Sequence, residues 1–532
     1  MSAEPAAPAP AIWRPRYNPW LIAVVVALAA FMEILDTSIA NVALPYMAGN
    51  LGASNDESTW VLTSYLVSNA IVLPISGWLA VTFGRKRFFM ACVAIFTLSS
   101  LLCGVAPTLE TLLLFRVMQG AGGGGLQPMA QAILADSFPP SQRGVAFALY
   151  GVTAVVAPTV GPTLGGWITF NYSWRWIFFI NLPVGIVVLG LVFRLIEDPP
   201  YLGRLKAAGV KLDYIGIALL TLGVGALQVL LDKGQEDDWF GSRFIVTLAI
   251  VAGVCLPGLV VWEWLHKEPI IDVRLFRKFN YLSANVMMFT LGILLFSSLV
   301  LMPQFLQTLV GYTAELAGLV LSGGAVALLL GLPVVGQLTT RVQARYIIAF
   351  GWLCLAIAMY YSTIRIDLLV SFSSATWLRV AQVVGFAFLF VPITLVAYVG
   401  VPAEKGNTVA GMINFMRNIG SSVGTSMVTT LIARRSQFHQ TILVGHADPR
   451  NQTFRNTVDG LTSRLTGFGL SPADARTHAY ARIYLALQAQ ATTLAYIDVF
   501  WLLAIGASIM FAMSFLLAKN DPRAGLGEAA VG

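Results

Sequence analysis

Two stretches of this chain resemble each other, and together they decide the expected fold. Residues 115–128 read "FRVMQGAGGGGLQP", and residues 378–392 read "LRVAQVVGFAFLFVP". Arg, Val and Gln recur at matching spacing, and a proline closes each copy. A second, fainter pair, "GWLAVTFGRKR" (77–87) and "GQLTTRVQAR" (336–345), repeats at nearly the same offset. Two pairs with one offset predict two similar halves in parallel orientation, a design known among transporters.

The rest of the chain has the composition of a membrane protein. Of its 532 residues, 57% are hydrophobic and only 11% are charged, whereas soluble domains carry about 25% charged residues. The mean hydropathy is +0.75. Apolar runs of about twenty residues recur along the chain, and each can cross a bilayer as a helix. We therefore expect an all-α polytopic membrane protein.

The apolar runs predict fourteen membrane-spanning helices. They lie at 20–45, 59–81, 88–106, 109–135, 143–169, 176–196, 213–231, 244–265, 281–303, 314–337, 346–364, 374–400, 407–432 and 493–517. They divide the chain into an N-terminal tail (1–19), a six-helix half (20–196), two inserted helices with their loops (197–280), a second six-helix half (281–517) that includes an outer loop (433–492), and a C-terminal tail (518–532). The first run is too long for the apolar region of a cleavable signal peptide.

Basic residues gather in one set of connecting segments. This set includes Arg85, Lys86, Arg87, Arg204, Lys206, Lys211, Arg277 and Lys278, whereas the short segments on the other side carry Arg175, Lys233, Arg243 and Arg365. Because basic loops stay in the cytoplasm, both termini are expected there. The net charge of +7 is then a matter of topology, and nucleic acid is not expected as a partner.

At these residues the chain resembles the major facilitator superfamily, specifically its fourteen-helix drug:proton antiporter branch. The resemblance is carried in order by "LDTSIANVALP" (35–45), the loop stretch 77–87, "LLLFRVMQGAGGGGLQP" (112–128) and "APTVGPTLGGW" (157–167). The stretch "WIFFINLPVG" (176–185) and the long outer loop extend the likeness to multidrug exporters of Gram-negative inner membranes.

The resemblance implies a major facilitator fold in the bacterial inner membrane and a function in multidrug efflux, and hence in antibiotic resistance. It implies hydrophobic drug-like molecules and protons as ligands and the proton gradient as the driving force, so no cofactor is expected. It also implies a tripartite pump, in which a periplasmic adaptor and an outer-membrane channel join the transporter, and loop 433–492 is a candidate docking surface. A solvated connector is the alternative for that loop, although a helix start at Ser471 and Pro472 predicts an outward extension of the last span.

The same resemblance implies residues for gating. They are Gly77, Gly84, Arg85, Lys86 and Arg87 in the loop after the second span, and Pro158, Gly161, Pro162, Gly165 and Gly166 in the fifth span. In the family an acid and a base precede the loop glycine, but here those positions are Val81 and Thr82. An acid-based latch between the halves is therefore not expected at these positions, and the basic cluster alone is left for that role. In the fifth span, plain packing and a hinge or seal are both compatible readings.

Two acids lie in the first span, where an ionised carboxylate costs about 2.5–3.5 kcal/mol on insertion scales. Glu33 and Asp36 are three residues apart, so they share a helix face. Asp36 belongs to the family motif and is the first candidate for carrying the coupled proton. Glu33 is the second candidate, and it could instead meet a cationic substrate. The matching ninth span has no acid, so proton handling is expected in the first half alone.

Arg116 of the fourth span must face the protein interior, because a buried guanidinium in lipid is costly. It is expected to pair with Asp36 or Glu33. Two roles remain open, a static counter-ion and a partner that tunes proton transfer. Arg379 and Arg417 also lie in apolar runs without an obvious acid, and we expect them to reach the interface by snorkelling. Attraction for an anionic substrate group is the alternative.

Polar and adaptable side chains in the spans could line a substrate cavity. The candidates are Asn41, Gln119, Gln127, Gln131, Met288, Trp352, Tyr361, Asn414 and Asn418. Such a surface suits varied apolar ligands, since methionine adapts its shape. For each aromatic residue or methionine, a place in the core or against lipid is the alternative. The glycine run 122–125 lacks the Lys-Ser/Thr ending of a phosphate loop and is expected to allow close helix packing.

Other function classes find less support in the sequence. A proton-coupled exporter of one metabolite or siderophore shares every feature above and remains an alternative. A membrane-embedded enzyme or a receptor would need a catalytic or metal-ligating cluster or an added domain. The histidines at 266, 439, 446 and 478 lie outside the predicted spans, and the four cysteines suggest neither disulfides nor a metal site. No catalytic and no metal-binding residues are expected.

Overall fold

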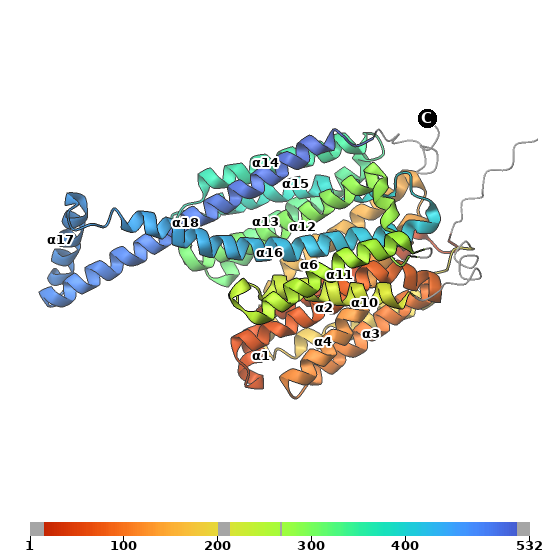
Figure 1. Cartoon of the computed structure of the whole chain (residues 1–532), viewed down its shortest axis with the longest axis horizontal. Coiled ribbons are helices and arrows are strands. Elements are labelled where there is room, and N and C mark those ends of the chain that lie inside the picture. The colour runs from red at the N-terminus through yellow and green to blue at the C-terminus, as the bar shows by residue number, and fades with distance from the viewer. Residues whose placement is uncertain (1–14, 201–212, 267–268, 519–532) are drawn as a thin grey trace, which may run out of the picture.

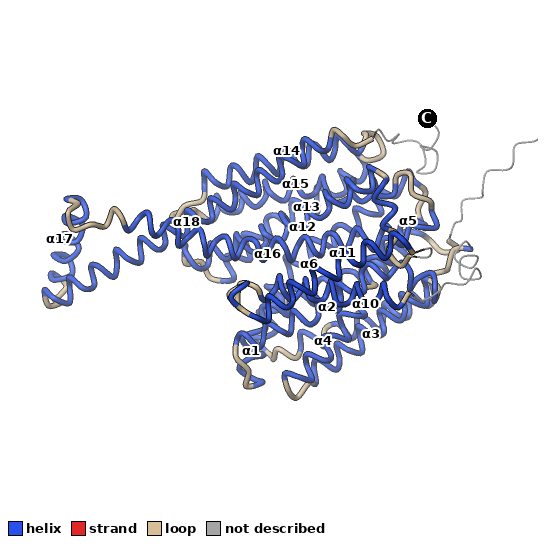
Figure 2. The backbone as a smooth tube through the Cα atoms, in the orientation of Figure 1, coloured by secondary structure: helices blue, strands red, loops and turns tan. Residues whose placement is uncertain are grey.

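The computed structural model of the chain describes residues 15–200, 213–266 and 269–518. In this part of the chain, long helices run side by side in one bundle, and no strand is present (Figures 1 and 2). The expectation of an all-α polytopic membrane protein is confirmed.

The helices follow the order that the apolar runs predict. The first half contains α1 (Pro19–Leu51), α2 (Asn55–Phe83), α3 (Arg85–Val105), α4 (Leu109–Gly123), α5 (Leu126–Ser137), α6 (Pro140–Asn171), α7 (Trp176–Phe179) and α8 (Asn181–Leu195). The inserted helices are α10 (Tyr214–Lys233) and α11 (Arg243–Leu265). The second half contains α12 (Phe279–Phe305), α13 (Ala314–Leu338), α14 (Ala344–Arg365), α15 (Phe372–Tyr398), α16 (Gly406–Val444), α17 (Gln452–Gly467) and α18 (Pro472–Ser514). Short turns join them at Trp239–Gly241, Val273–Arg277, Leu306–Val310 and Ala403–Lys405.

The number of helices that could span a membrane differs from the predicted fourteen in the described part of the chain. In the described part of the chain, 11 helices are long and apolar enough to cross a membrane, and α6, bent by 42°, would raise the number to 12. The predicted fourth span is divided at Gly124 and Gly125 into α4 and α5, which are each too short to count. The thirteenth corresponds to α16, which is rich in polar side chains. The count of fourteen therefore stays a prediction.

The glycine run at the α4–α5 break packs against two neighbouring helices. A Cβ atom on Gly122 would lie 2.7 Å from the Phe96 nitrogen of α3, and one on Gly124 would lie 2.7 Å from the Asn69 carbonyl oxygen of α2. Real side chains do not approach backbone atoms so closely, so only glycine fits. The expected role of this run in close helix packing is confirmed.

Helix α6 packs along α1, and its prolines open the backbone for a contact with α1. Pro162 has no N–H, so the Pro158 carbonyl oxygen lacks its usual partner within the helix. Ser38 Oγ of α1 donates to that oxygen at 3.0 Å. A Cβ atom on Gly161 would lie only 2.4 Å from Ser38 Oγ. This Pro-Gly stretch therefore forms a close seam between α1 and α6.

The two halves meet mainly where α6 lies against α13 and where α2 and α5 lie against α16. A Cβ atom on Gly144 would lie 2.8 Å from the Gly336 carbonyl oxygen, and one on Gly77 would lie 2.9 Å from the Thr408 nitrogen. Both contacts lie at the end of the bundle where α1 begins and α18 ends, which we call the terminal end. The halves are closed against each other there.

Helices α16, α17 and α18 form an extension at the opposite end of the molecule, which projects to the left in Figure 1. The expected outward helix is confirmed, because α18 runs from Pro472 without a break, and Ser471 accepts a hydrogen bond from the Asp474 N–H at 3.2 Å as its N-cap. At the base of the extension, Asp498 Oδ2 of α18 accepts a hydrogen bond from Arg435 Nε of α16 at 2.6 Å. It also lies 2.7 Å from His439 Nε2.

Candidate functional site

Asp36 and Arg116 form a buried ion pair between α1 and α4. Arg116 Nη1 lies 2.6 Å from Asp36 Oδ2, and the two side chains are exposed by only 0% and 1%. The contact that the sequence predicts between these residues is present. Because the desolvation of two charges is offset only by good geometry and further hydrogen bonds, the surroundings of the pair decide its stability.

Neutral groups add further hydrogen bonds to this pair. Asp36 Oδ1 accepts from Gln119 Nε2 at 2.9 Å and from Asn181 Nδ2 of α8 at 2.7 Å. Arg116 Nε donates to the Val61 carbonyl oxygen at 3.0 Å. Asp36 therefore has a complete set of partners in its ionised form.

Glu33 is equally buried, but within the described part of the chain no cation forms an ion pair with it. Its Oε1 accepts from Tyr65 Oη at 3.0 Å and from Asn69 Nδ2 at 3.1 Å, both on α2. Its Oε2 accepts from Gln127 Nε2 of α5 at 2.5 Å. The two acids thus share a helix face, as predicted, and yet have separate partners. Arg116 pairs with Asp36 and not with Glu33.

Gln127 connects Glu33 to the second half of the protein. Its Oε1 accepts from Tyr150 Oη of α6 at 3.1 Å and from Arg417 Nη2 of α16. The expectation that Arg417 snorkels to the interface is wrong, because its side chain is buried and points toward the first half. The physical reason is that an amide oxygen between the halves gives the guanidinium a hydrogen-bond acceptor.

The second half carries a counterpart of the Asp36–Arg116 pair in which the arginine has neutral partners. Arg379 of α15 is also buried, and its Nη1 donates to Ser298 Oγ of α12 at 2.9 Å. Gln382 Nε2 donates to Ser362 Oγ of α14 at 3.0 Å. The snorkelling expected for Arg379 is therefore wrong as well. Serine hydroxyls take the place of the acid, as the absence of an acid from the ninth span predicts.

At the terminal end, contacts of Arg85, the first residue of α3, join the two halves, and we call these contacts the latch. Arg85 is buried, and its Nη1 pairs with Asp136 Oδ2 of α5 at 2.6 Å. Its Nη2 donates to Asn407 Oδ1 of α16 at 2.8 Å, which crosses between the halves. The expectation that the basic cluster acts alone is wrong, because Asp136 supplies an acid that lies far from the loop in sequence.

The other residues of that cluster lie apart from the latch. The Lys86 N–H donates to Asp198 Oδ1 at 2.8 Å, and Arg87 is exposed. Gly84 has a φ of +92°, a conformation that favours glycine.

In the fifth predicted span, which is α6, Gly165 faces Ile39 of α1. A Cβ atom on Gly166 would have open space around it up to 3.9 Å.

The predicted cavity residues fall into two groups. Gln119 of α4 and Gln127 of α5 contact the two acids of α1, whereas Gln131, Asn414 and Asn418 lie in the polar contacts of α2 and α5 with α16. The remaining four do not join them. Asn41 is exposed on α1, Met288 is buried on α12, and Trp352 is buried on α14, which packs mainly on α15 and α18. Tyr361 is exposed near the end of α14 and accepts a hydrogen bond from Arg365 Nε at 2.8 Å.

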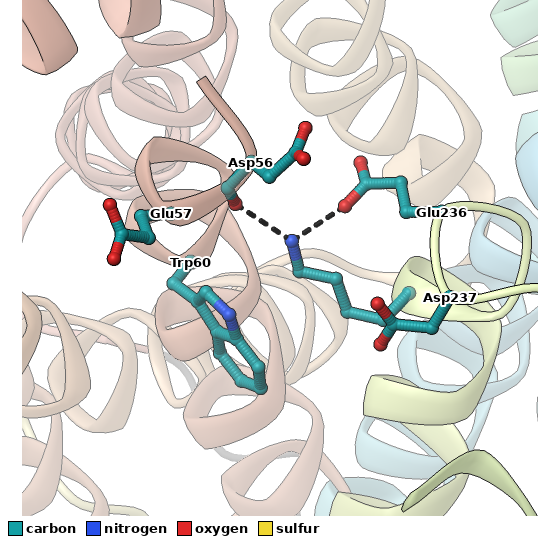
Figure 3. Close-up of a pocket in the computed structure, with 6 residues that line it drawn as sticks. Asp56, Glu57, Trp60, Glu236 and Asp237 are labelled. Carbon is teal, nitrogen blue, oxygen red and sulfur yellow. Dashed lines mark hydrogen bonds and ion pairs between the residues drawn. The ribbon is translucent and has the colours of Figure 1, made fainter. Parts of the chain in front are cut away.

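A small hollow lies between the start of α2 and the end of α10, away from the terminal end (Figure 3). It is lined by Asp56, Glu57, Trp60, Lys233, Glu236 and Asp237. Lys233 Nζ donates to the Asp56 carbonyl oxygen at 3.0 Å and pairs with Glu236 Oε2 at 2.6 Å. The volume of about 140 Å³ is below the roughly 300–1,000 Å³ of pockets for drug-sized ligands. The hollow is therefore part of the contact between α2 and the inserted helix α10.

A bundle of two similar helical halves with a buried acid–arginine pair has the architecture of a membrane transporter. The solved structure of the proton:xylose symporter XylE is similar to it, with a TM-score of 0.60 at 15% identity, covering 96% of this chain and 98% of that one. The model of the Major Facilitator Superfamily matches residues 26–425. The chain belongs to the major facilitator superfamily, and it is a multi-pass membrane transporter, not an enzyme.

Relatives at higher identity carry names of export and resistance proteins. The multidrug export protein EmrB of Haemophilus influenzae is 38% identical over 491 residues, which cover 91% of this chain and 93% of that protein. The fatty acid resistance protein FarB of Neisseria gonorrhoeae is 38% identical over 441 residues, which cover 82% and 85% of the two chains. The resemblance to multidrug exporters that the motifs indicate is confirmed.

Several residues of the buried network were not predicted from the sequence. Tyr65, Asn69, Tyr150 and Asn181 have no signal of their own, although Asn181 lies in the quoted stretch 176–185. Arg417 does have one, because an arginine in the middle of an apolar run generally faces the protein interior. The same rule places both Arg116 and Arg417 inside the helical bundle.

Proposed function

We propose that this chain is a proton-coupled antiporter that exports hydrophobic toxic compounds across the bacterial inner membrane, with both termini in the cytoplasm. The names of its relatives support multidrug efflux as the function. The concentration of basic residues in segments such as Arg85–Arg87 and Arg277–Lys278 supports the orientation, since basic loops stay inside. The terminal end of the bundle is then the cytoplasmic end.

The observation that carries the proposal is the different environment of the two buried carboxylates. Protonation of Asp36 would leave the buried Arg116 guanidinium without its counter-ion, which is strongly unfavourable. Protonation of Glu33 breaks no direct ion pair, because its direct partners are neutral. We therefore assign uptake of the proton to Glu33 first, which reverses the order that the family motif implies. The Asp36–Arg116 pair fixes the electrostatic surroundings of that proton.

The closed terminal end gives this proton a direction. With the Arg85–Asn407 contact and the Gly77–Thr408 approach intact, a proton reaches Glu33 from the periplasm and not from the cytoplasm. Rocking of the halves would then open the cytoplasmic side, release the proton and admit the cargo. Alternating access of this kind is the general way in which repeated halves transport a ligand.

The extension formed by α16, α17 and α18 supports a second part of the proposal. It projects from the bundle at the end opposite the terminal end, which is the periplasmic side in this orientation (Figure 1). We assign it to contact with a periplasmic adaptor that leads to an outer-membrane channel. A rigid pair of helices presents a defined surface for such a partner.

Transport in everted membrane vesicles tests the proposed function. Vesicles that contain the protein and carry an acidic interior should accumulate a lipophilic fluorescent dye, and collapse of the pH gradient should stop the accumulation. The Glu33→Gln variant should lose this dependence on the gradient. Dye accumulation that persists unchanged after collapse of the gradient would contradict antiport. No movement of any drug-like dye, with proton flux driven by one metabolite, would favour a narrow metabolite or siderophore exporter.

A further inference from the structure

One face of α16 contacts the first half and the inserted helix α10 through a row of polar side chains, which we call the polar seam. Its contacts are Asn407 with Arg85 (2.8 Å), Asn414 with Gln131 (2.9 Å), Arg417 with Gln127, Asn418 with Asn69 (3.4 Å) and Ser422 with Gln228 of α10 (2.6 Å). Positions three, four and seven residues apart lie on one helix face, so these side chains form a row along α16. It is the surface that must separate when the halves rock.

Only two contacts of the seam connect directly to Glu33. Gln127 donates to Glu33 Oε2, and Asn69 donates to Glu33 Oε1 at 3.1 Å. Of these two residues, Gln127 lies between two charged groups, because Arg417 donates to Gln127 Oε1 while Gln127 donates to Glu33. The other seam residues bind one another or the Arg85 latch.

The orientation of the Gln127 amide is determined by Arg417. A guanidinium has only donors, so the amide oxygen must face Arg417 and the amide N–H must face Glu33. That arrangement suits an ionised Glu33, because a carboxylate only accepts hydrogen bonds. Hydrogen bonds to charged groups are also the stronger ones. Gln127 thus lies between a negative and a positive group and is held by both.

We propose that Gln127 and Arg417 form a proton-sensitive tie between the halves, which is tight while Glu33 is ionised and loosens when Glu33 is protonated. The inference rests on the proposed function, in which Glu33 takes up the coupling proton. Gln127 and Arg417 are positioning residues here, since they act through Glu33. The tie connects a proton at α1 to the movement of α16.

Protonation changes the tie for two reasons. A neutral carboxyl oxygen is a weaker acceptor than a carboxylate, so the Gln127 N–H is held less firmly. The new O–H also needs an acceptor, and rotation of the amide to offer its oxygen would turn the amide N–H toward Arg417, where two donors oppose each other. The other groups around Glu33 are the hydroxyls of Tyr65 and Tyr150 and the amide of Asn69, none of which replaces the lost charge.

The direction of the effect fits exchange of a proton for cargo. A tight tie stabilises the arrangement described here, in which the terminal end is closed. A proton that arrives from the opposite side loosens the tie and favours opening at the terminal end. Release of the proton at the open terminal end restores the tie. The terminal end then closes as the cargo moves outward.

The test measures the distance between the halves as a function of pH. Spin labels are attached at Gln142 of α6 and Arg341 after α13, which are both exposed at the terminal end, in an active background without the native cysteines. In the parent protein, the ratio of open to closed populations should rise about tenfold when the pH is lowered from about 8 to about 5.5. A tenfold change is the size expected for the loss of one charge-assisted hydrogen bond. Arg417→Met and Gln127→Met should each reduce this change to less than about twofold.

A matched variant separates coupling from a purely structural role. Asn407→Ala removes a seam contact that does not touch Glu33 or its partners, and it should shift the ratio by a similar factor at every pH while keeping the full pH dependence. Arg417→Lys should restore part of the pH dependence, because its ammonium can still donate to Gln127. It also serves as the informative variant, together with Gln127→Met, if Arg417→Met does not fold.

The outcomes distinguish the tie from the proposed function. A parent-like pH dependence in both Arg417→Met and Gln127→Met would overturn the tie and leave proton uptake at Glu33 intact. A parent-like pH dependence in Glu33→Gln, with dye transport still driven by the gradient, would overturn the assignment of the proton and the tie with it. If Arg417→Met changes the ratio of open to closed populations by the same factor at every pH, and the ratio still varies with pH as in the parent, then Arg417 only stabilises the closed arrangement.

Discussion

At the scale of single residues, the two halves treat an equivalent arginine in two ways. Arg116 is followed three residues later by Gln119, and Arg379 by Gln382, and both arginines are buried. Arg116 faces the carboxylate of Asp36, whereas Arg379 faces the hydroxyl of Ser298. The same local sequence therefore holds an acid–arginine ion pair in one half and an arginine with neutral hydrogen-bond partners in the other. Removal of Arg116 should therefore have different consequences from removal of Arg379.

Replacement of the two arginines by methionine should separate these consequences. Arg116→Met leaves the buried Asp36 carboxylate unpaired and should cost about 3–5 kcal/mol, seen as a large fall of the unfolding midpoint in detergent. Arg379→Met leaves only hydroxyl and amide groups without a partner and should cost about 1–3 kcal/mol. Equal losses in the two variants would show that the Asp36 charge adds nothing to the role of Arg116.

The Asp36–Arg116 pair should also show strong coupling in a double-mutant cycle. Asp36→Asn leaves a buried guanidinium and should destabilise the protein by about 3–5 kcal/mol. Adding Arg116→Gln removes the remaining charge, and the double variant should recover at least half of that loss. Thermal unfolding of the two single variants and the double variant gives the coupling energy directly. Purely additive effects would argue against a buried ion pair.

At the scale of elements, the α1–α6 seam depends on glycines at particular places. Pro162 frees the Pro158 carbonyl for Ser38, and Gly161 lets Ser38 come close enough to reach it. Gly166 lies on the same helix but has no such neighbour. The motif therefore consists of glycines with different physical roles, which a sequence motif does not separate.

Alanine substitutions should rank these glycines. Gly161→Ala brings a Cβ atom within 2.4 Å of Ser38 Oγ and should cost about 1–3 kcal/mol through overpacking, together with a loss of dye transport. Gly166→Ala meets nothing closer than 3.9 Å and should be neutral or stabilise the helix by about 0.5–1 kcal/mol. The comparison uses unfolding midpoints and vesicle transport. Similar losses in both variants would refute a specific seam at Gly161.

At the scale of the whole molecule, the transport bundle and the extension are separable parts. Near the bundle, α16 and α18 are joined by Ser436 and Thr492 at 3.0 Å and by Gln440 and Tyr484 at 3.4 Å. Beyond that point the helices lead to α17, which lies away from the bundle (Figure 1). The inserted α10 packs on α2 and α16 and adds to the interface between the halves.

Removal of the extension should leave transport across the membrane intact. A variant that lacks residues 442–482, with a short glycine linker in their place, keeps the Gln440–Tyr484 contact. It should accumulate dye in everted vesicles at a rate within about twofold of the parent, because no contact of the proton site is lost. In whole cells, resistance to the exported drugs should fall if the extension binds an adaptor. Full resistance in cells would contradict the adaptor contact.

Much of this protein is determined by the sequence alone. Hydrophobic length and periodicity are local properties, so the helices, their order and the outward extension of α18 follow from them directly. The repeat and the motifs gave the family, and the rule that charges avoid lipid placed Glu33, Asp36 and Arg116 inside the bundle. The contact between Asp36 and Arg116 was predictable for the same reason, since a buried acid and a buried base in the same half stabilise each other by pairing.

Only the tertiary structure decided which groups share each contact. Asp36 and Arg116 are 80 residues apart, and Gln127 and Arg417 are 290 apart, and no local pattern encodes such a distance. The structure separated Glu33 from Arg116, turned Arg417 inward and supplied Asp136 as the acid of the latch. The physical reason is that burial follows from composition, whereas the choice of a hydrogen-bond partner depends on how distant helices pack.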